Sequence, residues 1–129
     1  MAPLKSGSRH GVPGYANSTV YNYIALGFWT YQSGPVDVAS LWANPVKFFL
    51  NTSVFGATND EIQKNLKKKY NDNNIKILIS ALGSSELPTT AKIDALSCAK
   101  KLADFVLGNN LDGVDIDYED NNAMNAGNG

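Results

Sequence analysis

Residues 111–119, LDGVDIDYE, decide how this sequence folds. Acidic side chains occupy every second position, at Asp115, Asp117 and Glu119, and apolar or aromatic residues lie between them. Because successive side chains of a strand point to opposite faces, the three carboxyl groups share one face, with neighbours roughly 6.5–7 Å apart. The other face can pack under helices. The stretch therefore predicts a strand with one acidic and one apolar face.

Two more apolar runs precede this stretch. Residues 20–29, VYNYIALGFW, are followed by a turn signal at Ser33, Gly34 and Pro35, and residues 75–80, IKILIS, are followed by Gly83. Short runs that are apolar almost throughout are typical of strands buried on both faces of a parallel sheet. The sequence therefore predicts three strands.

Helical patterns separate the predicted strands. Thr58 and Glu61 have the spacing of a capping box, which predicts a helix from there to about Tyr70. A second helix is expected over about residues 91–107, with Gly108 as its stop. It should bury Ile93, Leu96, Leu102, Phe105 and Val106. Residues 36–57 are expected to form a long loop with a helical turn or two, and residues 120–129 a loop.

The alternation of strands and helices predicts an α/β fold with a parallel sheet connected by right-handed crossovers. This order fits an open doubly wound sheet or part of a (β/α)8 TIM barrel. We expect residues 1–19 to be an irregular lead-in and residues 20–129 to form one domain.

Composition excludes several classes of function. The chain of 129 residues has 11 Lys plus Arg and 12 Asp plus Glu, so nothing favours nucleic acid or an anionic membrane as a partner. No apolar run approaches the roughly 20 residues that span a bilayer. One cysteine, Cys98, and one histidine, His10, allow neither an intrachain disulfide nor a Ser-His-Asp triad, and neither a cofactor nor a bound metal is expected.

The acidic face carries a cost that a fold alone does not require, because buried like charges repel and lose solvation. A proton shared between Asp115 and Asp117, with a protonated Glu119 at the mouth of the strand, would supply an acid at neutral pH. An acid beside a carboxylate is what glycosidic bond cleavage requires. The carboxyl end of a parallel strand is also where such folds place active sites.

The acidic face has three other interpretations. A calcium loop is excluded because its sixth position requires glycine and is Asp120 here. A divalent-metal site built from the carboxylates is a remaining alternative, and so is a charged, solvated edge strand. The apolar neighbours Val114 and Ile116 count against a solvated edge. Acid–base chemistry is therefore the preferred interpretation.

At these residues the sequence resembles glycoside hydrolase family 18, whose signature on the fourth barrel strand is DGxDxDxE. Asp112, Gly113, Asp115, Asp117 and Glu119 match every specified position. The preceding strand reads SALGS over residues 80–84, which departs from the common S-x-G-G and resembles the S-x-F-G-S of a fungal branch. The trailing EDNNAMNAG also resembles that branch, and the likeness covers about residues 20–129.

The resemblance implies hydrolysis of chitin, a β-1,4-linked polymer of N-acetylglucosamine, by a retaining mechanism in which the substrate's acetamido oxygen attacks its own anomeric carbon. It implies that Glu119 is the general acid and then base, that Asp117 orients the acetamido group, and that Asp115 tunes Asp117. Ser80 and Gly83 are expected to contact substrate. Trp29 or Tyr31 could stack on a sugar ring, or could equally pack in the core or a loop.

The resemblance also implies what is missing. A full barrel has eight strands and typically about 250 residues, whereas this sequence stops just after the fourth strand and shows no first strand in residues 1–19. We therefore expect an incomplete catalytic domain that is inactive alone. The alternatives are an endo-β-N-acetylglucosaminidase acting on glycoprotein glycans, a chitin-binding lectin-like protein, or a gene remnant. The family implies an extracellular protein, although the chain has no signal peptide, and the oligomeric state stays open.

Overall fold

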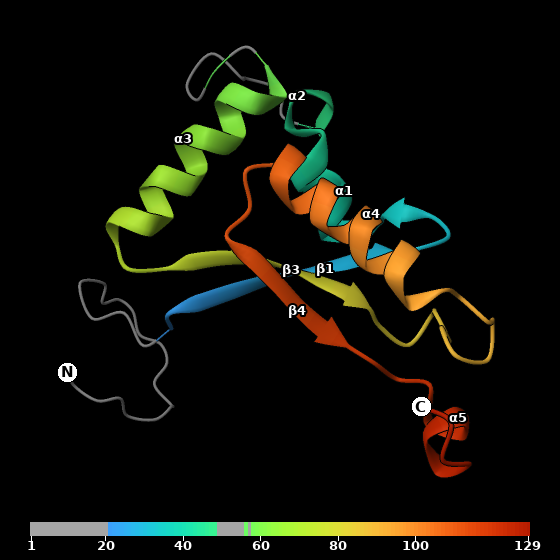
Figure 1. Cartoon of the computed structure of the whole chain (residues 1–129). Coiled ribbons are helices and arrows are strands. Elements are labelled where there is room, and N and C mark those ends of the chain that lie inside the picture. The colour runs from blue at the N-terminus through green and yellow to red at the C-terminus, as the bar shows by residue number, and fades with distance from the viewer. Residues whose placement is uncertain (1–20, 49–55, 57) are drawn as a thin grey trace.

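The computed structural model describes residues 21–48, 56 and 58–129. The predicted lead-in over residues 1–19 lies outside the described residues, as does part of the predicted loop over residues 36–57. Within the described residues the chain forms a four-stranded sheet in the order β2-β1-β3-β4, with helices packed against it (Figure 1). The predicted order of strand, helix, strand, helix and strand is confirmed. Closure into a (β/α)8 barrel stays a prediction.

Three of the strands are those the sequence predicts. β1 (Tyr23–Thr30) and β4 (Gly113–Asp117) both pair in parallel with β3 (Lys76–Leu82), which is the central strand. The fourth strand, β2 (Gly34–Pro35), pairs antiparallel with the end of β1, within the segment read as a turn. β2 and β4 therefore form the two edges of the described sheet.

The helices depart from the predictions at several points. The segment of residues 36–57 agrees with its prediction of a helical turn or two, because its described part contains two short helices, α1 (Asp37–Ala43) and α2 (Pro45–Phe48). Two other helical segments differ from the predictions. α4 (Ala95–Gly108) begins later than predicted, because the Asp94 side chain accepts a hydrogen bond from the Ser97 amide and caps it there. The predicted C-terminal loop is wrong in part, since residues 121–125 form α5 (Asn121–Asn125). Over the described residues, none of these helices is long and apolar enough to cross a membrane.

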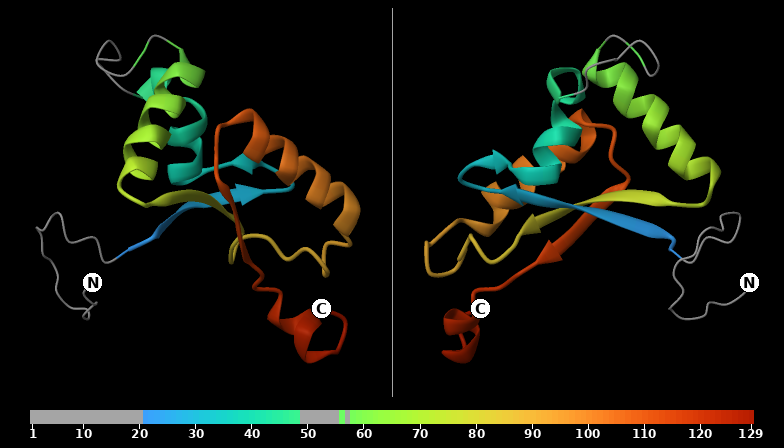
Figure 2. Two further views of the ribbon diagram at one scale, coloured as in Figure 1. Left: turned by 60° about the vertical axis from the view of Figure 1, so that its left-hand side comes forward. Right: turned by 180° about the vertical axis from the view of Figure 1, so that it is seen from behind.

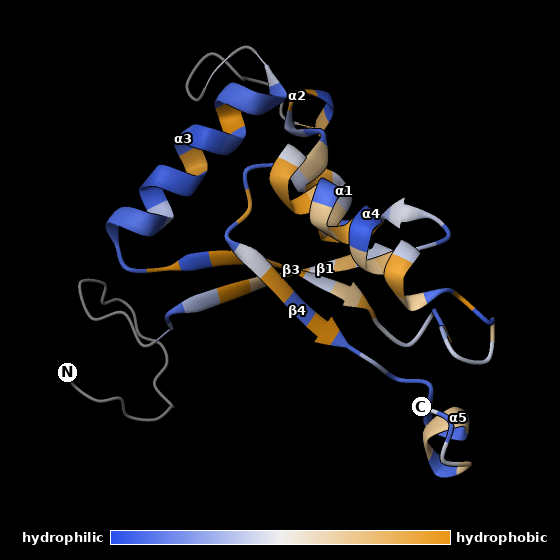
Figure 3. Cartoon of the chain, in the orientation of Figure 1, coloured by the Kyte–Doolittle hydropathy of each residue, from blue (hydrophilic) through white to orange (hydrophobic). Residues whose placement is uncertain are grey.

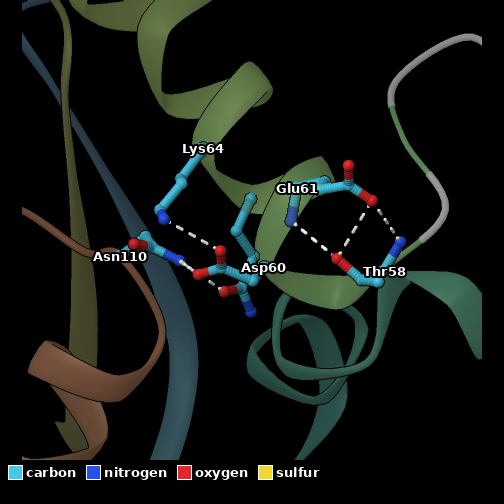
Figure 4. Close-up of polar contacts among 6 residues, drawn as sticks. Thr58, Asp60, Glu61, Lys64 and Asn110 are labelled. Atoms are coloured by element: carbon cyan, nitrogen blue, oxygen red, sulfur yellow. Dashed lines mark hydrogen bonds and ion pairs between the residues drawn. The ribbon is translucent and has the colours of Figure 1, made fainter.

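The predicted capping box at the start of α3 (Asn59–Asp72) is confirmed (Figure 4). The Glu61 amide donates to Thr58 Oγ1 over 3.1 Å, and the Thr58 amide donates to Glu61 Oε1 over 3.1 Å. Each bond satisfies a backbone donor that the first turn of a helix leaves unpaired. The box therefore sets where α3 begins. The helix is 14 residues long and ends at Asp72, shortly before β3.

The core lies between the sheet and helices α1, α3 and α4, which cover the same face (Figure 2). Ile77, Ile79 and Ala81 of β3 point to this face and are buried. α3 is mostly hydrophilic, with apolar residues recurring about once per turn (Figure 3), and its Ile62 is fully buried. Periodic apolar residues on the helices and β-branched residues on β3 thus form one continuous core.

Two predictions about this face are wrong. Leu96, expected to be buried, is 64% exposed on the first turn of α4. Val114 and Ile116 of β4 were expected to pack under helices, yet Ile116 is 55% exposed. Both residues lie on an edge strand and line an apolar groove beside α4, together with Cys98 and Leu102. The cause is the position of β4 at the edge of the sheet. In the described residues, α4 is the helix that lies beside Val114 and Ile116, and it covers them only in part.

The capping box gives a first test of the fold. Thr58→Ala removes a cap oxygen and leaves an amide unpaired, so the free energy of unfolding should fall by about 0.5–2 kcal/mol. Urea denaturation followed by far-ultraviolet circular dichroism measures this change. Lys64→Ala is the control, because it removes only the exposed ion pair with Asp60 in the same turn (Figure 4) and should change stability little. Equal losses in the two variants would contradict the role given to the box.

Candidate active site

The register of β3 and β4 places the predicted acidic residues. Ser80 lies opposite Asp115 and Leu82 opposite Asp117, whereas Ile79 lies opposite Val114. Partners in a parallel pair share a face, and Ile79 is on the face that the helices cover. Asp115 and Asp117 therefore lie on the opposite face, which carries no helix along β1 and β3 in the described residues (Figure 2).

Asp115 is held by the neighbouring strand. Ser80 Oγ donates to Asp115 Oδ2 over 3.0 Å, and Ser80 is itself buried. Ser80 was predicted to contact substrate, and in this structure its hydroxyl is engaged by Asp115. The Ser80–Asp115 bond fixes the carboxylate on the open face and adds a side-chain link to the backbone pairing of the two strands.

Glu119 lies two residues past the end of β4, which was predicted to include it. A hydrogen bond with Asp117 raises the pKa of the Glu119 carboxyl above its ordinary value, and burial and the Asp117 charge act in the same direction. The sequence suggested a proton shared between Asp115 and Asp117. In the structure the Ser80 hydroxyl donates to Asp115, and Asp117 is the carboxylate that raises the pKa of Glu119. The acid–base pair is therefore at the mouth of the strand.

Gly83 shapes the floor beside this pair. Its φ of +72° is one that residues with a side chain rarely adopt, and its amide donates to the Asp117 carbonyl over 2.9 Å. A Cβ atom at this position would lie 3.1 Å from the ring of Phe28. Gly83 was predicted to contact substrate. In the structure it joins the end of β3 to the end of β4 and makes room for Phe28.

The two predicted sugar-stacking residues lie elsewhere. Trp29 is 3% exposed within the core cluster, opposite Ala81 on the face the helices cover. The ring of Tyr31 lies beneath the Lys101 ammonium of α4, 4.3 Å from it, and also packs against the core. Core packing, the alternative reading of both residues, is what the structure shows. Neither ring faces Asp115 and Asp117.

The first residue of the acidic motif is structural. Asp112 Oδ2 accepts from the Ile77 amide over 2.8 Å and from Asn71 Nδ2 over 3.1 Å, and Lys67 lies 3.4 Å from Oδ1. Burial tends to raise the pKa of Asp112, but these hydrogen bonds and the Lys67 charge outweigh it and lower the pKa. Asp112 therefore joins the start of β4 to the start of β3 and the end of α3.

Two buried carboxylates were missed by sequence reasoning. Glu86 is 4% exposed and accepts from the amides of Tyr31 over 2.7 Å and Gln32 over 3.1 Å. Asp120 is 1% exposed, caps α5, and accepts from the amide and hydroxyl of Thr90. Glu86 lies in a polar loop with no local signal, and its partners are 54 and 55 residues away. Asp120 falls in the predicted C-terminal loop, although Asp before a helix is a capping signal.

The structure gives no support to the metal-site alternative. Within the described ranges, no three His, Cys, Asp or Glu side chains come together as a group that could hold a metal ion. The acidic side chains instead have separate partners, with Ser80 on Asp115 and Glu119 on Asp117. What the arrangement can do is hold a proton on Glu119 next to a carboxylate, on an accessible face.

Comparison with known proteins points to one class of enzyme. No family model matches this sequence, and no curated protein does. Among solved structures, the chain is similar to a glycoside hydrolase family 18 chitinase from Pseudoalteromonas aurantia, with 26% sequence identity and a TM-score of 0.54. The match covers 84% of this chain and 37% of that one. The chain therefore has a fold like that of family 18 over its matched part, and it spans little more than a third of that chitinase.

The hydrogen bonds of Asp112 predict how stability depends on pH. The pKa of Asp112 is lower in the folded than in the unfolded chain, so its contribution is complete above the unfolded value of about 3.9 and is lost as pH falls through the folded value. Asp112→Asn should therefore be less stable than wild type at neutral pH, with the difference shrinking in acid. Thermal unfolding across this pH range measures it. A difference that is constant with pH would contradict the assignment.

The two hydrogen bonds of Glu86 predict a structural loss. Glu86→Ala leaves the amides of Tyr31 and Gln32 without their acceptor, which should lower the free energy of unfolding by about 1–3 kcal/mol. Denaturant unfolding measures this loss. Ser85→Ala, at the exposed neighbouring position, is the matched control and should change stability little. Hydrogen exchange at Tyr31 and Gln32 should rise only in Glu86→Ala, and an unchanged rate would contradict the contact.

Proposed function

We propose that this chain is the part of a glycoside hydrolase family 18 domain that carries the catalytic acid, and that the whole enzyme cleaves β-1,4 links between N-acetylglucosamine units of chitin. The observation that carries the proposal is the placement of Asp115 and Asp117 on the open face of a parallel strand, with Glu119 just past its carboxyl end and the pKa of Glu119 raised by Asp117. The match of DGVDIDYE to the family signature supports it, and so does the structural likeness to a chitinase.

The chemistry follows from the positions of the three acids. Glu119, whose pKa is raised, keeps its proton to a higher pH and donates it to the oxygen of the leaving sugar. The acetamido oxygen of the substrate then attacks the anomeric carbon, and Asp117 orients the acetamido group and stabilises the positive charge that develops. Glu119, now a carboxylate, takes a proton from the water that completes the reaction. Asp115 is held by the Ser80 hydroxyl and lies before Asp117 on the same face of β4, where its carboxyl group tunes Asp117.

Two finer points belong to the proposal. The SALGS of residues 80–84 and the EDNNAMNAG that follows Tyr118 favour the fungal branch of the family. An insoluble polymer as substrate favours action outside the cell. The chain also lacks an opposite wall to its acidic face in the described residues, so the 129 residues by themselves should bind a chitooligosaccharide weakly and show little turnover.

The role of Glu119 is tested in a chimera in which this chain replaces the matching segment of the Pseudoalteromonas aurantia chitinase. Glu119→Gln keeps the shape of the side chain but cannot donate a proton, so turnover of a fluorogenic chitobioside should fall by about 10²–10⁴-fold. Binding of chitotriose, measured by calorimetry, should be largely kept. Because Glu119 acts as an acid, the rate should also fall as pH rises through its raised pKa.

The same substitution at Glu61 is the matched control. Glutamine preserves a capping box, and Glu61 lies at the start of α3, so Glu61→Gln should keep full turnover. If Glu119→Gln retains more than about a tenth of the wild-type rate, Glu119 is not the acid. Parallel assays on colloidal chitin and on a glycoprotein carrying N-linked glycans separate a chitinase from an endo-β-N-acetylglucosaminidase, and faster release from the glycoprotein would overturn the proposed substrate.

A further inference from the structure

Glu119 lies where the sheet no longer holds the chain. β4 ends at Asp117, whose carbonyl accepts the Gly83 amide in the last backbone bond between the two strand ends. Residues 118–120 belong to no strand or helix, and α5 begins only at Asn121. A free segment of this kind would let Glu119 swing away from Asp117. The Asn121 amide donates to the Glu119 carbonyl over 2.9 Å, and the contacts of the two sequence neighbours of Glu119 further limit where its carboxyl group lies.

Both neighbours of Glu119 are held by adjacent threonines. Tyr118, before it, shares a hydrogen bond between its hydroxyl and Thr89 Oγ1 over 2.7 Å. Asp120, after it, accepts from the Thr90 amide at Oδ2 over 2.7 Å and from Thr90 Oγ1 at Oδ1 over 2.8 Å. The Asp120 carboxylate is buried, and hydrogen bonds to an ionised group are the strong ones. Of the two anchors, the Thr90–Asp120 pair is therefore the firmer.

The loop that provides these threonines is itself fixed. It runs from Gly83 to Asp94, and Glu86 ties its first part to the amides of Tyr31 and Gln32 after β1. Its later part is folded on itself, with the Ala91 amide bonded to the Leu87 carbonyl and the Ile93 amide to the Pro88 carbonyl. The loop is thus a brace from the end of β1 to the end of β4, and Thr90 is its contact with the acid segment.

We propose that Thr90, acting through the Asp120 carboxylate, is a positioning residue that holds Glu119 beside Asp117. The proposal rests on the proposed function, because it concerns the acid assigned there. Asp117 is the charged group that raises the pKa of Glu119. The Asp120 carboxylate is bound by Thr90. The loop that faces this segment contributes the hydroxyl groups of Thr89 and Thr90. When the anchor is lost, Glu119 should leave Asp117 and its carboxyl should titrate nearer its ordinary value.

The test is a titration of the side-chain carboxyls of the 129-residue chain by nuclear magnetic resonance. Thr90→Val weakens the anchor by removing the hydroxyl that donates to Asp120 Oδ1, keeps the amide that donates to Oδ2, and leaves the charge unchanged. Thr90 is exposed, so the valine fits. In wild type the Glu119 midpoint should lie above the ordinary value of about 4.3. In Thr90→Val it should move toward that value, and in Thr90→Ser, which keeps the hydroxyl, it should match wild type.

Thr58→Ala separates positioning from general loss of stability. This variant weakens the remote cap of α3 and should unfold more easily than wild type while leaving the Glu119 midpoint unchanged. A wild-type midpoint in Thr90→Val, or an equal shift in Thr58→Ala, would overturn the proposal. If Thr90→Val does not fold, Thr90→Ala is measured by the same criteria.

The chimera distinguishes this proposal from the proposed function. A shifted Glu119 midpoint in Thr90→Val, together with full turnover in Glu119→Gln, would leave the anchor in place and overturn the catalytic role. Loss of turnover in Glu119→Gln with an unshifted Glu119 midpoint in Thr90→Val would support the catalytic role and overturn the role of Thr90. Where both proposals hold, Thr90→Val should move the alkaline limb of the rate profile to lower pH, because Glu119 then loses its proton sooner.

Discussion

The register in which β4 pairs with β3 is the constraint on which the site depends. Side chains alternate along a strand, so a slip of one residue would turn Asp115 and Asp117 into the core and Val114 and Ile116 to the open face. Three contacts oppose such a slip. Asp112 exchanges hydrogen bonds with Ile77 at the start, Ser80 binds Asp115 in the middle, and Gly83 binds the Asp117 carbonyl at the end. Two of the three use an acidic side chain of the motif and the third uses the Asp117 carbonyl, so the motif helps to align its own strand.

The two faces of the sheet at β3 and β4 contribute differently to stability and to the site. The inner neighbours of β4 on β3, Ile79 and Ala81, are buried under helices, and this burial favours folding. The open face brings carboxyl groups together, which raises the pKa of Glu119 and disfavours its charged form. Such a group opposes folding at neutral pH and is tolerated as pH falls. The acid pair is therefore held in place by contacts made elsewhere along the chain.

Loops contribute those contacts. Glu86 and Asp120 are buried carboxylates that bind backbone amides of other loops. Charged groups are seldom buried unless they are well paired, and each of these has at least two donors. Between them they connect the carboxyl ends of β1, β3 and β4. The geometry at the mouth of the strands thus depends on loop anchors as much as on the sheet.

The sequence by itself determined the features that follow from local periodicity. Alternating acids at residues 115–119, the capping box of Thr58 and Glu61, and short apolar runs predicted the strands, the start of α3 and the shared face of Asp115 and Asp117, because these patterns depend on near neighbours. Whether Trp29 packs in the core and whether Leu96 is buried depend instead on contacts between elements, which local periodicity does not specify. The register of β1 shifts between Gly27 and Trp29, which turns Trp29 onto the side of Ala81 and into the core.

Only the tertiary structure decided which distant groups bind the carboxylates. Ser80, 35 residues away from Asp115, donates its hydroxyl to that acid. Asp120 meets Thr90 across 30 residues, and Glu86 meets Tyr31 across 55. No local pattern encodes such partners, since they are set by which strand ends and loops the sheet brings together. Periodicity therefore specified the elements and the acidic face, and long-range packing specified the environment that gives each acid its role.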